Sequence, residues 1–361
     1  MRKNFLDGLR GWASLMVVFS HLMPRLLTDL TPEYDRPWFN FITDGGLAIY
    51  IFFVLSGFAL SVKFVDTRNA DVLTRSAAAR YFRLAIPIFG ASLFGHALMT
   101  TGLMAHIDDA ANLFHSKEWL GTFYNFESTL PWVLQFSFYN VLADYQGLQS
   151  YSPALWTMPI EFVGSFLVLG YCALFGKRTQ EAGSLPILPF VIGISLLMFY
   201  VPIYSCFLIG YLLAEMFAEA RLRDSRWVQI AAGALFAVPV ACSTWFRTDS
   251  EPLMVLQATA VVLAVSFSPW LRRFFSSRVS EFLGSLSFPL YLVHFAVICS
   301  FTSSLYLWLH HQPLSNLTIS NITLISSVAV SLLVAWLFLP VEKFSIKASR
   351  NFADFLLKFR H

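Results

Sequence analysis

The chain has 361 residues, of which 57% are hydrophobic and only 13% are charged, and its mean hydropathy is +0.61. A soluble domain carries about 25% charged residues, so this chain has about half the charge that a soluble surface requires. The composition excludes a disordered chain, a disulfide-rich secreted scaffold and an ordinary cytosolic enzyme. A polytopic membrane protein remains, and its small net charge of +3 says less than the positions of the charges do.

Apolar segments of the length that a membrane helix needs, about 17 to 25 residues, recur along the whole chain. The predicted spans are 9–27, 45–64, 84–104, 156–175, 186–201, 202–219, 228–246, 253–269, 283–305 and 321–340. The fifth and sixth form one apolar run that is broken at Pro202, which predicts a tight hairpin. We therefore predict an all-α fold: a polytopic helical bundle of about ten spans, forming a single domain over 1–361 without a separate soluble domain.

The distribution of basic residues gives this layout a direction across the membrane, because cytosolic segments are enriched in Lys and Arg. With the N-terminus in the cytosol, all but four of the 25 Lys and Arg residues fall on the inner side. The four on the outer side are Arg25, Arg36, Lys117 and Arg247. Ten spans then place both the N-terminus and the C-terminus in the cytosol.

Ionisable side chains inside predicted spans are costly and therefore suggest function. Arg10 and His21 share the first span, and their spacing places them on nearly one helix face, about 16 Å apart along the axis. Glu161 lies early in the fourth span, where it either pairs with a buried Arg or His or polarises a catalytic group. A snorkelling anchor at Arg10, a satisfied interior histidine at His21 and a structural ion pair at Glu161 remain open alternatives.

Six motifs follow one another along nearly the whole chain. They are Leu6-Asp7-Gly8-Leu9-Arg10-Gly11-Trp12-Ala13 followed by His21, the segment from Gly46 to Phe58, Arg80-Tyr81-Phe82-Arg83-Leu84 with Pro87, the segment from Leu155 to Phe162, the segment from Ser287 to His294, and Val341-Glu342-Lys343. In this order they resemble the membrane acyltransferase-3 family. The chain departs from the family pattern at Ala79, where a further basic residue is common, and at Phe344, where Pro is common.

The resemblance implies O-acyl transfer, usually of an acetyl group, from cytosolic acyl-coenzyme A as the donor substrate. The implied acceptor is a hydroxyl of an envelope or exported carbohydrate, such as an exopolysaccharide, a lipopolysaccharide or another lipid-linked glycan. The implied location is the bacterial inner membrane, with the lipid bilayer as a partner and no nucleic acid involved. No permanently bound cofactor and no metal site are expected.

The same resemblance assigns roles to individual residues. His21 is the expected general base or transient acyl carrier, since imidazole titrates near neutral pH, and Arg10 and Glu161 complete the catalytic set. Arg80 and Arg83 lie one helical turn apart and are expected to bind the phosphates of coenzyme A, although both also suit positive-inside anchors. Trp156 and His294 are expected to contact the acceptor.

The long outer segment 105–155 is rich in aromatic residues, whose apolar faces suit the C–H surface of a sugar. We predict that it caps the outer mouth of the cavity and that Trp119 and Tyr124 help to bind the acceptor. An interfacial aromatic belt is the alternative.

A different class of function is also compatible with these residues. Intramembrane Arg, His and Glu also serve ion-coupled transporters and flippases of glycans or small solutes. Such carriers commonly consist of repeated halves, and no internal repeat is obvious in this sequence.

Overall fold

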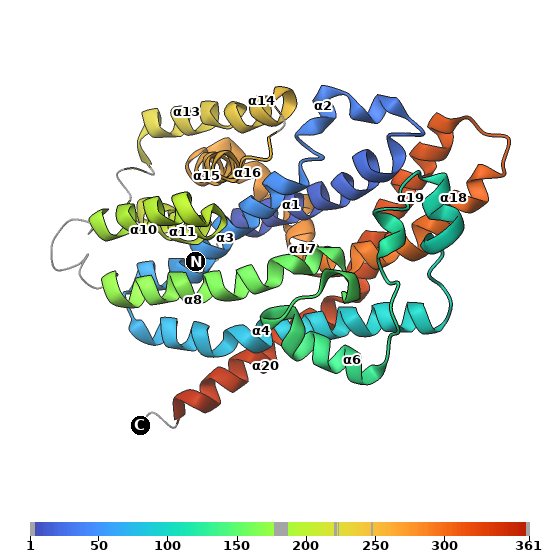
Figure 1. Cartoon of the computed structure of the whole chain (residues 1–361). Helices are drawn as coiled ribbons and strands as arrows, with labels where there is room; N and C mark the ends of the chain where they lie inside the picture. The colour runs from blue at the N-terminus through green and yellow to red at the C-terminus, as the bar shows by residue number, and fades with distance from the viewer. Residues whose placement is uncertain (1–3, 177–186, 220–221, 223, 247, 359–361) are drawn as a thin grey trace.

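The computed structural model describes residues 4–176, 187–219, 222, 224–246 and 248–358. Every regular element in these ranges is helical and none is a strand, which confirms the predicted all-α class. Figure 1 shows the long helices packed side by side, with α13 and α14 along one edge and α20 near the opposite edge. The principal helices are α1 (Asn4–Leu22), α3 (Gly45–Thr67), α4 (Ala70–Thr100), α8 (Thr157–Phe175), α10 (Ile187–Tyr200), α11 (Pro202–Ala218), α13 (Arg226–Leu235), α14 (Ala237–Trp245), α15 (Glu251–Phe267), α16 (Pro269–Phe275), α17 (Arg278–Val297), α18 (Ser303–His310), α19 (Asn316–Leu337) and α20 (Leu339–Lys358).

Helices occupy each of the ten predicted ranges, but not all of them have the length and composition of a membrane span. Within the described residues, six helices are long and apolar enough to cross a membrane, and the pair α15–α16, bent by 96°, would add a seventh. The six are Pro37–Thr67, Ala70–Thr100, Pro153–Phe175, Arg226–Trp245, Arg278–His310 and Asn316–Lys358. The structure thus supports a polytopic membrane protein, while the number ten and the cytosolic termini stay predictions.

Two boundaries show how helix ends depend on local chemistry. The predicted hairpin at Pro202 is confirmed, because α10 ends at Tyr200, α11 begins at Pro202 and the ring of Phe190 stacks on that of Tyr211 at 4.6 Å. The predicted third span, 84–104, is too short at its start: α4 begins at Ala70, where the side chain of Asn69 accepts a hydrogen bond from the backbone N–H of Asp71. The predicted inner loop at Lys177 and Arg178 lies outside the described residues.

Helices α1 and α17 form the contact that positions the site. Gly11 of α1 faces the backbone of α17, and a Cβ added to it would lie 2.4 Å from the backbone nitrogen of Gly284. Small residues at such contacts allow helix backbones to approach closely inside a membrane. Trp12 adds a polar tie between the two helices, since its indole Nε1–H donates to Ser280 Oγ at 3.0 Å.

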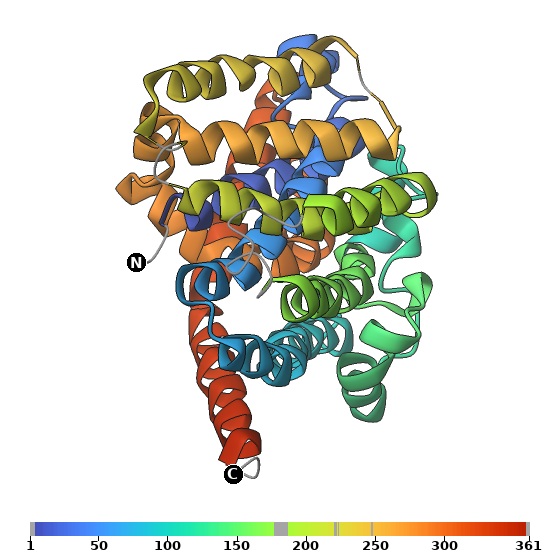
Figure 2. The ribbon, with the colours of Figure 1, turned by 90° about the vertical axis from the view of Figure 1, so that its left-hand side faces the viewer.

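Helices α4 and α20 form a second pair, in which α20 runs outward past the rest of the bundle (Figure 2). The rings of Phe82 and Phe352 lie 4.6 Å apart in a T-shaped contact. Arg83 pairs with Glu342 at 2.5 Å, which ties the start of α20 to the middle of α4. The end of α20 is held by an ion pair between Arg75 and Asp354.

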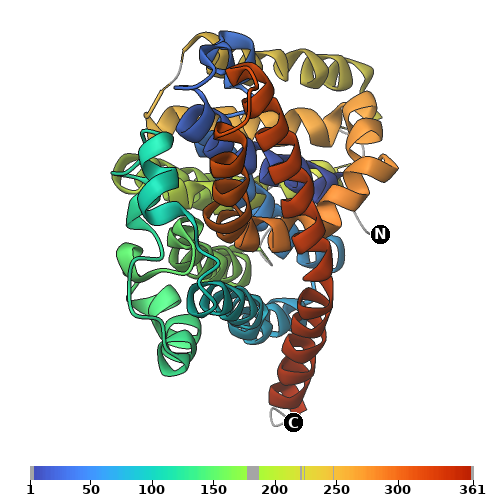
Figure 3. The same ribbon diagram turned by 90° about the vertical axis from the view of Figure 1, so that its right-hand side faces the viewer.

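The segment 105–155 folds into short helical turns that gather at one end of the bundle (Figures 1 and 3). These turns are η3 (His106–Ala110), α5 (Ala111–Leu113), η4 (Leu120–Thr122), α6 (Leu130–Gln135), η5 (Phe136–Asn140), α7 (Val141–Ala143), η6 (Gly147–Gln149) and η7 (Pro153–Trp156), the last of which leads into α8. The longest has 6 residues, far fewer than a membrane span needs. None of these turns has the length of a membrane span, and the location of the segment on the outer side stays a prediction.

Candidate active site

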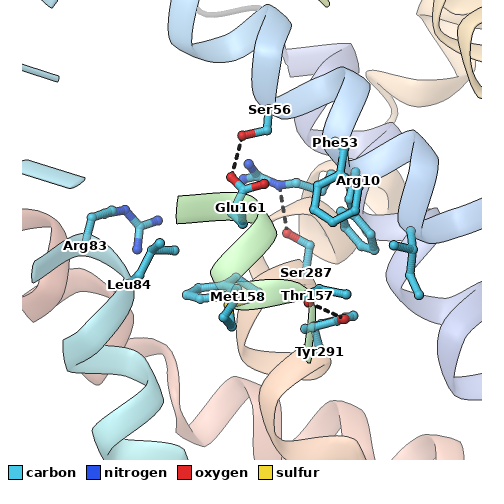
Figure 4. A pocket seen from close by; sticks show the side chains of 13 residues that line it. Arg10, Phe53, Ser56, Arg83, Leu84, Thr157, Met158, Glu161, Ser287 and Tyr291 are labelled. Carbon is cyan, nitrogen blue, oxygen red and sulfur yellow. Dashed lines mark hydrogen bonds between the residues drawn. The ribbon is translucent and has the colours of Figure 1, made fainter. Parts of the chain in front are cut away.

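One cavity, of about 110 Å³, opens between α1, α3, α4, α8 and α17. Most of its wall is apolar, and polar side chains interrupt it at a few points. These polar side chains are Arg10, Ser56, Arg83, Thr157, Glu161, Ser287 and Tyr291. Figure 4 shows them directed toward a shared space from helices that are far apart in the sequence.

A buried network surrounds the carboxylate of Glu161 in this cavity. Arg80 of α4 forms an ion pair with Glu161. Ser56 of α3 donates its hydroxyl to the same carboxylate oxygen, as Figure 4 shows. The side chains of Arg80 and Glu161 are only 12% and 15% exposed. Charges buried this deeply need a partner, and Arg80 and Glu161 neutralise each other. Together with Ser56, the pair joins α3, α4 and α8 at one point.

The guanidinium of Arg10 is held at another wall of the same cavity. Its Nε donates to Ser287 Oγ at 3.2 Å, and Ser287 in turn donates to the carbonyl oxygen of Gly284 at 2.9 Å. Asp7, one turn before Arg10 on α1, accepts from the guanidinium at 3.4 Å. These contacts orient Arg10 across the α1–α17 interface, which a simple anchor at the membrane surface would not require.

Arg83 also lines this cavity, but it is already paired. Its guanidinium donates to both carboxylate oxygens of Glu342, at 3.2 and 2.5 Å. A bidentate contact fixes the plane of the guanidinium as well as its position. The side chain remains 27% exposed, so part of its hydrogen-bonding capacity is open to a ligand.

Another cavity, of about 720 Å³, contains His21 and lies further along α1. Trp119 from segment 105–155 and Trp156 at the start of α8 line it, as does Arg25. The guanidinium of Arg25 lies 5.8 Å from the centre of the Trp119 ring, within the range of a cation–π contact. Ile49 and Tyr291 line both cavities and therefore form the wall that they share.

His21 lies against a second histidine. Its Nδ1 is 3.0 Å from Nε2 of His294, the ring centres are 5.2 Å apart and the ring planes differ by 13°, so the two rings meet edge to edge and are nearly coplanar. Trp119 and Phe295 pack around the same imidazole, with ring centres 5.6 and 5.5 Å away. His294 is fully buried. The pair is formed by residues 273 positions apart in the sequence.

The structure divides the residues singled out in the sequence between these two cavities. Arg10, Arg83 and Glu161 line the smaller one, with Arg80 behind Glu161. His21, Trp119 and Trp156 line the larger one, with His294 behind His21.

The sequence left Glu161 either a pairing with a buried Arg or His or a catalytic role; it pairs with Arg80, and His294 makes the contact with His21. One placement differs from what the sequence suggested. Tyr124 is buried and does not line the cavity of His21; its hydroxyl donates to the carbonyl oxygen of Tyr151 at 2.5 Å.

Some polar residues of the site had no role assigned from the sequence. Ser287 and Glu342 belong to motifs that the sequence displays, and their positions in those motifs were the available signal. Arg25 carries no such signal beyond being one of few basic residues on the predicted outer side. Among the described residues, no group of three or more His, Cys, Asp or Glu side chains is placed to hold a metal ion.

Comparison with known proteins bears on what this arrangement does. The sequence matches the acyltransferase domain family Acyl_transf_3 over residues 3–339. It is similar to O-acetyltransferase PaAT-1 of Phomopsis amygdali, with 25% identity covering 81% of this chain and 71% of that protein. Acyltransferase clz18 of Cochliobolus lunatus is 23% identical over 87% of each chain. The putative peptidoglycan O-acetyltransferase YrhL of Bacillus subtilis is 24% identical, covering 81% of this chain and 48% of YrhL. No solved structure matches the chain.

The family match covers nearly the whole chain and includes every residue that lines the two cavities. It favours an enzyme over the transporter that the sequence left open. The chain therefore belongs to the acyltransferase domain family Acyl_transf_3, and it is an integral membrane O-acyltransferase.

Proposed function

We propose that this enzyme transfers an acyl group, usually acetyl, from cytosolic acyl-coenzyme A to a carbohydrate hydroxyl on the other side of the membrane. The observation that carries the proposal is that two cavities follow one another along α1 and share a wall. Arg10 lines one cavity, His21 lines the other, and Ile49 and Tyr291 form the wall between them. A donor and an acceptor that approach from opposite sides of the membrane would meet at that wall.

The smaller cavity suits the donor. Coenzyme A combines an anionic phosphate-bearing head with a slender pantetheine arm that ends in the thioester. Arg10 and Arg83 supply cationic forks at the cavity, and such forks bind phosphate well. Phe52, Phe53 and Phe288 supply an apolar wall for the arm. In this proposal Arg80 acts on the donor indirectly, by holding Glu161 in place.

The larger cavity suits the acceptor. Trp119 and Trp156 present aromatic faces on which a sugar ring can pack, and Asp44, Asp249 and Arg25 add polar groups. The name of the relative YrhL, a putative peptidoglycan O-acetyltransferase, supports a glycan acceptor. The proposal assigns the enzyme to a membrane that separates acyl-coenzyme A from an exported glycan, as the bacterial inner membrane does.

The chemistry needs one proton acceptor near the wall. His21 takes the proton from the acceptor hydroxyl while the hydroxyl oxygen attacks the acyl carbon of the thioester. The C–S bond breaks, the coenzyme A thiolate leaves, and His21 returns the proton to that sulfur. The products are the sugar ester and free coenzyme A, and His21 ends in its starting state.

The test is an assay in lipid nanodiscs with radiolabelled acetyl-coenzyme A and a panel of bacterial envelope glycans. We expect label in a base-labile ester on a glycan, together with release of free thiol. His21→Ala should lower the rate by about 10²- to 10⁴-fold, the range that a positioned base contributes. Ser20→Ala, which changes a neighbouring residue of the same cavity, is the matched control and should stay active. Full activity in His21→Ala, or no transfer from acyl-coenzyme A to any glycan of the panel, would contradict the proposal.

A further inference from the structure

The hydrogen bonds of His294 determine which of its ring nitrogens carries a proton. Nδ1 of His294 lies 3.0 Å from the carbonyl oxygens of Leu290 and of Tyr291, one turn earlier on α17. A carbonyl oxygen only accepts hydrogen bonds, so Nδ1 must be the protonated nitrogen of this ring. The sequence alone suggested that His294 contacts the acceptor, but these bonds give the ring a different set of partners.

The other nitrogen of His294 is then an acceptor. The ring is fully buried, and no carboxylate of the described residues is paired with it. A second proton would therefore create a buried charge with no carboxylate beside it, which a low-dielectric interior strongly disfavours. In the neutral ring Nε2 carries a lone pair, and this lone pair faces Nδ1 of His21 at 3.0 Å.

The tautomer of His294 in turn determines the tautomer of His21. Because His294 Nε2 accepts, Nδ1 of His21 must donate, and the neutral imidazole of His21 then has its lone pair on Nε2. Nε2 of His21 has no hydrogen-bond partner among the described residues, and the side chain lines the larger cavity. The nitrogen without a protein partner is thus the one that can accept a proton.

We propose that His294 is a positioning residue that fixes the tautomer and the orientation of His21, so that Nε2 of His21 presents its lone pair to the acceptor hydroxyl. The inference rests on the proposed function, in which His21 is the base. In this arrangement a neutral imidazole, hydrogen-bonded to backbone carbonyls, takes the place of the carboxylate found in many acyl-transfer sites. A partner of this kind orients the base without bringing a negative charge into the membrane interior.

The hydrogen bond between His21 and His294 depends on the contact between helices α1 and α17. Since α1 and α17 meet through Gly11 and Gly284 without side chains between them, the histidines further along the two helices lie within hydrogen-bond distance. The near-coplanar arrangement, with 13° between the ring planes, suits a hydrogen bond in the plane of both rings, which holds His21 toward His294. Phe295 contacts His21 edge-on and limits rotation further.

The direct test is ¹⁵N NMR of the whole protein in nanodiscs, labelled at histidine, with His21→Ala and His294→Leu used for assignment. Protonated and bare ring nitrogens have well-separated ¹⁵N shifts. We expect His21 to be protonated at Nδ1 and bare at Nε2, and His294 to have the same tautomer. A His21 ring protonated at Nε2, or an equal mixture of tautomers in the wild-type protein, would overturn the inference.

Kinetics supply the second test. His294→Leu should lower kcat by about 10²- to 10⁴-fold and leave the KM of both substrates within about twofold, because it removes the acceptor for His21. His294→Gln places an amide oxygen near the position of the lost Nε2, and its kcat should be at least tenfold higher than that of His294→Leu. Val293→Ala removes buried volume beside it on α17 and should leave kcat nearly unchanged. Wild-type kcat in His294→Leu would refute the role of His294. If His21→Ala were active while the NMR tautomer is as expected, only the proposed base would be wrong.

Discussion

Gly11 of α1 and Gly284 of α17 approach so closely that a Cβ on Gly11 would lie 2.4 Å from the backbone nitrogen of Gly284. No ordinary side chain fits at this distance without moving one helix. The same two helices carry His21 and His294, which lie 3.0 Å apart. The separation of the histidines is thus set by a contact between two residues that take no part in the chemistry.

Gly11→Ala should therefore remove activity from a distance. The added methyl group pushes α1 away from α17 and lengthens the contact between His21 and His294, so we expect a lower Tm and at least a tenfold lower kcat. Gly170→Ala on α8 is the control, because a Cβ there meets nothing within 4 Å; Ala in a helix is favoured over Gly by about 1 kcal/mol. Unchanged kcat and Tm in Gly11→Ala would show that the two helices are free to separate.

Arg83 offers a test of the donor site. Losing a charged hydrogen bond to phosphate costs about 1.5 to 3 kcal/mol, so Arg83→Ala should raise the KM for acyl-coenzyme A by about 10- to 100-fold. Arg83→Lys should recover little of this, since Lys lacks the planar fork. Arg75→Ala removes another Arg of α4 that pairs with α20 and lies outside the cavity, and it should leave that KM unchanged. Equal effects of the two Ala variants would mean that Arg83 only ties α4 to α20.

Glu161 and Arg80 should matter first for stability. Glu161→Gln leaves the Arg80 guanidinium buried and unpaired, which costs about 3 to 5 kcal/mol and should lower the Tm strongly. The exposed pair of Arg75 and Asp354, whose side chains are 52% and 47% exposed, is the contrast. Asp354→Asn should cost about 0.2 to 1 kcal/mol. A Glu161→Gln protein as stable as the wild type but inactive would instead make Glu161 a direct participant in catalysis.

Sequence patterns predicted the structural features that depend on a single helix. Helix content, the break at Pro202 and the placement of Arg10 and His21 on one face of α1 all follow from local spacing and hydropathy. Partners on different helices do not follow from such patterns. Glu161 could pair with any buried cation, and its choice of Arg80 over His21 depends on how α4 and α8 pack.

His294 shows the same limit more sharply. It lies 273 residues from His21, and no periodicity within either helix indicates that the two rings meet. The contact becomes visible only when α1 and α17 are placed side by side.

Substitutions at Trp119 and Tyr124 can distinguish acceptor binding from the folding of the outer segment. Both lie in segment 105–155, and the sequence offers no reason to choose between them. The structure does: Trp119 lines the larger cavity beside His21, whereas Tyr124 is 3% exposed and donates its hydroxyl to the carbonyl oxygen of Tyr151. Burial raises the pKa of the Tyr124 hydroxyl well above its usual value, which keeps this donor protonated.

We therefore expect opposite outcomes from the two substitutions. Trp119→Ala removes a ring on which the sugar packs, and it should raise the KM for the glycan by about tenfold while the KM for acyl-coenzyme A stays constant. Tyr124→Phe removes one buried hydrogen bond and leaves a carbonyl oxygen unsatisfied, so it should cost about 1 to 3 kcal/mol of stability with both KM values unchanged. Measuring Tm and both KM values for each variant makes the comparison. If Trp119→Ala changes only Tm, the segment serves as a structural cap, and the glycan must bind between the membrane helices instead.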